Sequence, residues 1–179
     1  MHTTQALEGV TLASFAFQEN SHIISVFTKE HGRLKCVTKS YRKSNVRGLC
    51  PLLGVEIQVI VSDKELWKCK ECLVTTSYPN LRLSLDHLRF SAQVTDLLDK
   101  LLPLHHPVPQ LYELYKQFLA NLPHFKKPHV AACIFLENFL VSEGMLDATS
   151  AVLKGSLTES YEAQIDLGYY HKLVHTLIK

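Results

Sequence analysis

The stretch HIISVFTKEHGRLKCVTK, His22–Lys39, contains two strand patterns joined by a turn. Its first part is a short apolar run rich in β-branched residues, which favour strands. Its second part alternates, with Leu34, Cys36 and Thr38 on one face and mostly cations on the other. Gly32 suits the turn between the two parts. The stretch therefore predicts two consecutive strands.

Three further strand patterns flank this pair. GVTLASFAF (residues 9–17) precedes it, and LLGVEIQVIVS (52–62) and LWKCKECLVTT (66–76) follow it. In the second of these, Val55, Ile57, Val59 and Val61 share one face. Five strands separated by turn signals favour a small Greek-key barrel over a sandwich.

From about Asn80 the apolar period becomes helical. One predicted helix ends before Pro103, and the next opens near Pro109. VAACIFLENFLVSEG (residues 130–144) is apolar almost all round and predicts a buried helix, while residues 161–179 predict one or two more, broken or capped near Gly168. The fold class is thus α+β, with a five-stranded barrel over residues 1–78 and an all-α helical domain over residues 79–179.

Composition narrows the class of protein. The chain has 179 residues, 46% of them hydrophobic, and a net charge of only +2. We expect no signal peptide and no membrane segment, and therefore a soluble, cytoplasmic protein. Five cysteines in a chain of this size predict reduced thiols rather than a disulfide framework.

The cations are concentrated in one segment, residues 29–47. It contains seven basic residues and one acid, Glu30, which predicts a docking surface for a polyanion. A cationic barrel binds single-stranded nucleic acid by contacting phosphates and stacking bases on aromatic faces. The predicted nucleic-acid-binding residues are Lys29, Arg33, Lys35, Lys39, Tyr41, Arg42, Lys43 and Arg47. The alternative is a solvated surface loop that only keeps the protein soluble.

The string ENSHIISVFTKEHGRLKCVTKSYRKSNVRGLCPL, residues 19–52, resembles the N-terminal signature of the bacterial recombination mediator RecO. The matching elements are Glu19 and Ser21, Phe27–Gly32, the basic segment, and Arg47–Pro51. Helical segments up to residue 146 are similar to that family as well. Lys39-Ser40-Tyr41 departs from a Lys-Gly-Ala pattern. The absence of cysteine after Cys133 removes the four-cysteine zinc site of many members.

The resemblance implies an OB-fold domain and a helical domain without a zinc-binding insertion. It implies a protein of the bacterial nucleoid that binds single- and double-stranded DNA and promotes strand annealing. It also implies partners: RecR, the C-terminal tail of single-strand-binding protein and, indirectly, RecA. The expected protein is not an enzyme and needs no cofactor.

Three alternatives remain open at this stage. The first is an OB-fold RNA-binding protein acting in translation or RNA handling. The second is a zinc-dependent enzyme that uses Cys69 and Cys72, with Cys36, Cys50 or histidines such as His105, His106, His171 and His175. Residues three apart on a strand point to opposite faces, so we expect Cys69 and Cys72 to be incidental thiols and predict no metal site. The third alternative is a scaffold whose basic loop binds nothing.

Overall fold

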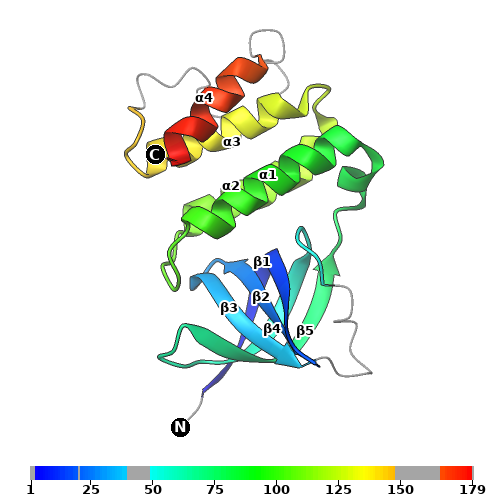
Figure 1. Cartoon of the computed structure of the whole chain (residues 1–179), viewed down its shortest axis with the longest axis vertical. Helices are drawn as coiled ribbons and strands as arrows, with labels where there is room; N and C mark the ends of the chain where they lie inside the picture. Colours follow the sequence, from blue (N-terminus) through cyan, green and yellow to red (C-terminus); the bar gives the residue numbers. More distant parts are fainter. Residues whose placement is uncertain (1–2, 20, 40–48, 148–165, 179) are drawn as a thin grey trace. The chain divides into compact units, whose positions relative to one another are not determined.

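The N-terminal part of the protein is a closed five-stranded barrel (Figure 1). This computed structural model describes residues 3–19, 21–39, 49–147 and 166–178. The strands are β1 (Thr4–Gln18), β2 (Ser21–Thr28), β3 (Gly32–Lys39), β4 (Gly54–Ile60) and β5 (Leu66–Thr76). Their order around the barrel is β1-β2-β3-β5-β4, which is the strand order of an OB fold and confirms the predicted fold class.

Two features of strand pairing close the barrel. β1 is long enough to pair with β4 over Thr4–Val10 and with β2 over Gly9–Gln18. β3 and β5 pair in parallel, with residues 35–38 of β3 opposite residues 66–69 of β5. Because β3 and β5 pair with each other, the sheet closes on itself, and the paired part of the barrel has no free edge.

The interior is filled by the faces that the alternation predicted. Val55, Ile57 and Val59 of β4 are fully buried, and Leu34 and Cys36 of β3 lie in the same hydrophobic cluster. Side chains of this size fill a barrel of five strands, so a ligand must bind on its outer surface.

The predicted orientation of Cys69 and Cys72 was wrong. Both side chains are buried in the barrel core with Cys36. The register of β5 against β4 shifts between Cys69 and Glu71, and this bulge at Lys70 turns both cysteines inward. Burial raises the pKa of the Cys69 thiol to about 11 and that of Cys72 to about 12, so both are protonated at neutral pH.

Four α-helices and two short 3₁₀ helices lie in the described residues after the barrel. They are η2 (Pro79–Leu83), α1 (Leu85–Leu101), α2 (Pro109–Asn121), η3 (Leu122–His124), α3 (Pro128–Ser142) and α4 (Leu167–Ile178). α1 ends before Pro103 and α2 opens at Pro109, as predicted. α3 is buried on nearly every side, and Gly168 lies in the first turn of α4. None of the helices in these ranges combines the length and apolar character of a membrane span.

The chain forms two compact units. The first contains residues 1–78 with residues 95–113, and the second contains residues 79–94 with residues 114–179. The barrel unit therefore includes the last turns of α1, the Pro-rich connector and the first turn of α2. The division into domains at residue 78 remains a prediction from the sequence.

Gly32 lets the Pro-rich connector approach β3 closely. Its φ is +65°, and a Cβ at this position would lie 1.9 Å from the carbonyl oxygen of His106. Beside it, the amide of His105 donates to the carbonyl oxygen of Arg33 at 2.9 Å. The turn glycine is thus required twice, for its left-handed backbone and for the contact.

We predict that Gly32→Ala destabilises the protein by about 2–5 kcal/mol. A left-handed residue with a Cβ costs about 1–2 kcal/mol, and forcing the His106 backbone away costs about 1–3 kcal/mol more. Gly144→Ala is the matched control, because Gly144 has a φ of +69° but nothing within 4 Å of its Cβ position. Urea unfolding of both variants measures the difference. Equal losses would mean that the connector does not constrain Gly32.

Candidate nucleic-acid interface

The outer face of β3 and β5 carries two lysines close together. Lys35 projects outward because its neighbours Leu34 and Cys36 point into the core. In the parallel pairing of β3 with β5, Val37 lies opposite Lys68, and Lys35 is two residues from Val37 on the same face. Lys35 and Lys68 are therefore diagonal neighbours, roughly 7–8 Å apart at their Cα atoms, which suits a pair of phosphate contacts.

Lys29 lies in the turn between β2 and β3 and is paired within the barrel unit. Its ammonium group donates to Glu113 Oε1 at 2.8 Å, and both side chains are about half exposed. An exposed pair of this kind is worth only about 0–1 kcal/mol, so a phosphate can compete for the lysine.

Arg33 is held by Asp99 of α1. Its Nη1 donates to the backbone carbonyl oxygen of Asp99 and to Asp99 Oδ1, the latter at 3.3 Å. The hydroxyl of Ser25 also donates to Asp99 Oδ1. The Arg33 and Asp99 side chains are 13% and 17% exposed, so this guanidinium binds the α1 segment instead of facing solvent.

The remaining predicted contacts follow in the sequence from the end of β3. Lys39 is the last residue of β3. Tyr41, Arg42, Lys43 and Arg47 lie outside the described residues.

Thr11 fixes the chain just after that segment. Its hydroxyl donates to the carbonyl oxygen of Cys50 at 2.8 Å and accepts from the amide of Leu53 at 3.0 Å. Backbone hydrogen bonds join Thr11 to Leu52 and Leu53 as well, and Leu49 and Leu53 are in the barrel core. The cationic segment is thus bounded by β3 on one side and by a buried anchor on the other.

Lys68 was missing from the predicted site residues. The sequence does indicate that Lys68 faces outward. In the alternating strand LWKC, its side chain points to the face opposite that of Trp67 and Cys69, which are buried. What the sequence did not reveal is that β5 pairs with β3, which places Lys68 beside Lys35.

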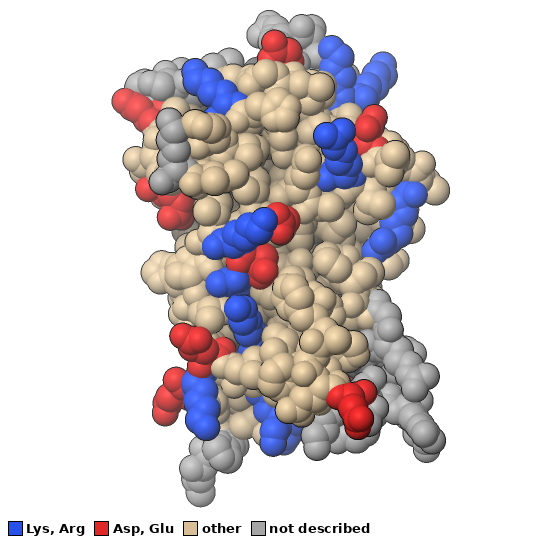
Figure 2. All heavy atoms as spheres, viewed as in Figure 1, with Lys and Arg blue, Asp and Glu red and all other residues tan. Residues whose placement is uncertain are grey.

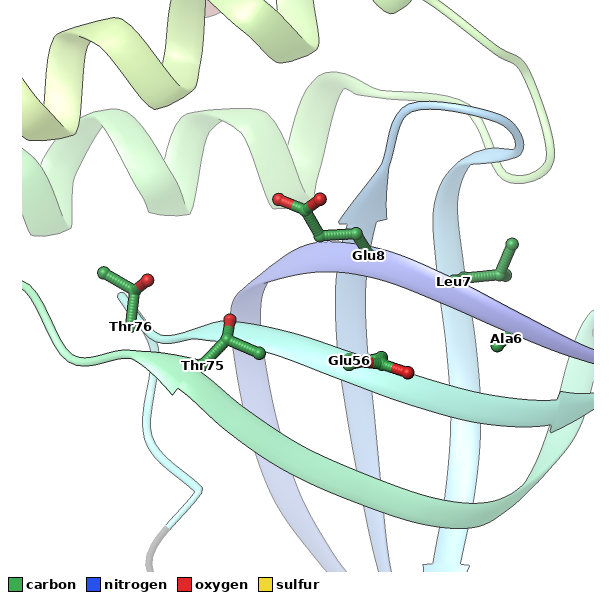
Figure 3. Close-up of a pocket in the computed structure, with 6 residues that line it drawn as sticks. All are labelled: Ala6, Leu7, Glu8, Glu56, Thr75 and Thr76. Carbon is green, nitrogen blue, oxygen red and sulfur yellow. The ribbon is translucent and has the colours of Figure 1, made fainter.

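A second part of the barrel surface is acidic. A hollow of about 490 Å³ is lined by Ala6–Glu8, Glu56, Thr75 and Thr76. Glu8 and Glu56 lie directly opposite each other on β1 and β4, and Figure 3 shows their carboxylates turned in different directions. Two exposed carboxylates on neighbouring strands disfavour a phosphate, so this hollow is not part of the candidate interface.

Charges on the barrel are otherwise mixed in the view of Figure 2. Basic and acidic side chains lie together along one flank of the barrel, and uncharged surface covers its middle. The described surface in this view is therefore not a single positive field, and the cationic character is local to the segments named above.

The helical unit has a hollow of its own. It measures about 180 Å³ and is lined by Asp86, Arg89, Phe90, Gln93, Pro128, His129, Leu167, Tyr170 and His171. Phe90 and Tyr170 meet edge to face with ring centroids 5.2 Å apart, and the Tyr170 hydroxyl donates to Gln93 Oε1 at 3.0 Å. The floor is apolar, and the rim carries one arginine, two histidines and one carboxylate.

Cys36, Cys69 and Cys72 share the barrel core, but in the part of the chain that the structure describes the candidate ligands do not form a metal site. There, no group of three His, Cys, Asp or Glu side chains is arranged to hold a metal ion. His105 instead stacks on Trp67 with ring centroids 5.0 Å apart. The zinc-enzyme alternative has no support in the described residues.

Comparisons with known proteins agree with this geometry. Residues 1–78 match the family model described as Recombination protein O N terminal. DNA repair protein RecO of Geobacter sulfurreducens is 29% identical over 118 residues, which cover 64% of this chain and 48% of that protein. DNA repair protein RecO of Pelobacter propionicus is 26% identical over 121 residues, covering 66% and 49%.

A longer match is found with DNA repair protein RecO of Syntrophobacter fumaroxidans, 27% identical over 151 residues, or 83% of this chain and 60% of that protein. The chain spans about half to three fifths of the length of these curated relatives. The resemblance predicted from residues 19–52 is confirmed: residues 1–78 match the family model described as Recombination protein O N terminal, and 83% of the chain is similar to a protein named DNA repair protein RecO.

Proposed function

We propose that this chain acts in DNA repair as a RecO-like recombination mediator. It binds single- and double-stranded DNA through the outer surface of its barrel, promotes strand annealing, and assists recombinase loading at gaps coated by single-strand-binding protein. The observation that carries the proposal is the pair Lys35 and Lys68 on adjacent strands, together with the run of cations that follows β3 in the sequence.

The proposed DNA surface differs from the predicted set in one residue, because Lys68 takes the place of Arg33. It contains Lys35, Lys39, Lys68 and the residues Tyr41, Arg42, Lys43 and Arg47, with Lys29 at its edge. Arg33 supports the surface by holding α1 against β2 and β3 rather than by meeting a phosphate, since Asp99 already satisfies its charge.

The proposed activity needs electrostatics and no covalent chemistry. Two DNA strands repel each other through their phosphates, and a cationic surface lowers that repulsion while the bases pair. No part of the described barrel surface offers a base-reading helix, so we propose binding with little sequence preference.

The proposed partners follow the family resemblance. They are RecR, the acidic C-terminal tail of single-strand-binding protein and, indirectly, RecA, in the bacterial cytoplasm at the nucleoid. For the acidic tail we propose the hollow of the helical unit. Its apolar floor of Phe90 and Tyr170 suits a hydrophobic terminal residue, and Arg89 at the rim suits carboxylates.

We predict that the double variant Lys35→Glu, Lys68→Glu lowers affinity for both single-stranded and duplex DNA by at least about tenfold at low salt. Each lost phosphate contact removes counterion release, so the slope of log K against log salt for single strands becomes shallower by about 1.4 for two contacts. Fluorescence anisotropy with labelled oligonucleotides at several salt concentrations gives both numbers. The double variant Arg42→Glu, Lys43→Glu tests the adjoining segment in the same way.

The matched control is Lys126→Glu, Lys172→Glu, which makes the same change in net charge on exposed positions of the helical unit. It should leave affinity within about twofold. Equal losses in test and control variants would show a nonspecific effect of net charge and contradict the proposed surface. Tighter binding of the wild-type protein to RNA hairpins than to single-stranded DNA would favour the RNA-binding alternative.

We predict that Arg89→Glu weakens binding of a synthetic acidic peptide with a hydrophobic C-terminal residue by about tenfold or more. The reason is the loss of a charge-assisted hydrogen bond, worth about 1.5–3 kcal/mol, and its replacement by a repelling carboxylate. Isothermal titration calorimetry measures the change. Lys126→Glu, an exposed lysine outside the hollow, is the control, and unchanged affinity of the Arg89 variant would place the tail elsewhere.

A further inference from the structure

Two phenylalanines are exposed near the C-terminal end of β1. Phe15 is 54% exposed and Phe17 is 49% exposed, although both belong to strand β1 of the barrel. The ladder with β4 stops at Val10, so this end of β1 pairs with β2 alone. Two large apolar side chains exposed within three residues of one strand indicate a surface that meets another molecule.

The register connects Phe15 to the proposed DNA surface. Phe15 lies opposite Ile23 on β2, Ile23 opposite Val37 on β3, and Val37 opposite Lys68 on β5. Directly opposite residues share a face, so these four side chains form one outward row. The row crosses three strand spacings, about 14 Å along the sheet between the backbone of Phe15 and that of Lys68.

The neighbouring row adds a second cation. It contains Ala13, Ser25, Lys35 and Leu66 in the same strand order. No acidic residue occupies either row, and Asp99, which contacts Ser25, is already paired with Arg33. Ser25 is fully buried and bound to Asp99 of α1, so the row of Phe15, Ile23, Val37 and Lys68 is the one that links the aromatic end to a cationic end.

Phe17 owes its position to a bulge. The register of β1 against β2 shifts between Ala16 and Gln18, which leaves Phe17 without a partner residue in the ladder. A bulge re-aims the side chain that it carries, and here Phe17 stays half exposed beside the turn to β2. Glu19 in that turn marks the limit of the apolar surface.

We infer that Phe15 and Phe17 form a base-stacking platform for single-stranded DNA, which gives the barrel its preference for single strands over duplex. Charge complementarity selects this occupant, because the lysines of both rows take phosphates while the aromatic rings take bases. Bases in a duplex are already stacked and paired, so the rings add affinity only for single strands. The inference rests on the proposed function and names two residues of that same surface.

The test compares the double variant Phe15→Ala, Phe17→Ala with the wild-type full-length chain. Affinity for a single strand that carries its bases, such as oligo-dT, should fall by at least about tenfold. Each stacked base is worth several-fold to a hundredfold in affinity. Affinity for duplex DNA should stay within about twofold. An abasic single strand should bind the wild type and the variant equally, because it has no bases to stack.

Controls separate this inference from the proposed function. The variant Leu83→Ala, Leu85→Ala removes two exposed apolar side chains from the helical unit and should change neither affinity. If the phenylalanine variant binds single strands normally while Lys35→Glu, Lys68→Glu weakens both DNA forms, the platform is wrong and the DNA surface stands. Equal loss for single strands, duplex and abasic strands would also overturn the platform. Failure of the wild-type protein to bind any DNA would overturn the proposed function itself.

Discussion

Closure of the barrel is the constraint on which the other features depend. β1 pairs with β2 and with β4, and the parallel pairing of β3 with β5 completes the ring. A five-stranded ring leaves an interior that Leu34, Ile57 and their neighbours fill completely. Recognition is therefore confined to the outer surface, where the alternation of each strand decides which side chains are available.

Different parts of the outer surface of the barrel differ in which side chains cover them. Near the start of β3, Arg33 and Ser25 are bound to Asp99, and Phe27 meets Tyr112 with ring centroids 5.5 Å apart. Farther along β3, Lys35 and Val37 are only partly covered, and Lys68 of β5 is exposed beside them. On β1 and β4, the exposed residues Glu8 and Glu56 are directly opposite each other in the strand pairing. These differences leave one stretch of the barrel suited to a polyanion.

Much of the fold could be predicted from the hydrophobic periodicity of the sequence and from the positions of its prolines. Alternation around Leu34 and Ile57 gave the inward faces, and the prolines at positions 103 and 109 marked where one helix ends and the next begins. Cys69 and Cys72 escaped this reasoning, because a bulge changes the facing of a strand without changing its composition. The contacts of Arg33 and Lys68 could not be predicted from the sequence for another reason. Asp99 lies 66 residues from Arg33, and the contact of β5 with β3 depends on the closed topology.

In the proposed function, different parts of the surface contribute different interactions with DNA. Lysines act on phosphates at a distance and are weakened by salt, whereas phenylalanines act only on bases that touch them. A protein that must hold one unpaired strand and then accept its complement benefits from both, because the stacking contacts are lost when the bases pair. The hollow of the helical unit, with Arg89 above an apolar floor, suits a peptide instead of a nucleic acid.

The most direct test of the central claim is lysine footprinting. The protein is acylated briefly with and without saturating single-stranded DNA, and the modification of each lysine is measured by mass spectrometry. The account predicts that DNA protects Lys35, Lys39, Lys43 and Lys68, while Lys100, Lys126 and Lys172 are modified at unchanged rates. Protection that is uniform over all lysines, or that is confined to the helical lysines, would contradict a DNA surface on the outer face of β3 and β5.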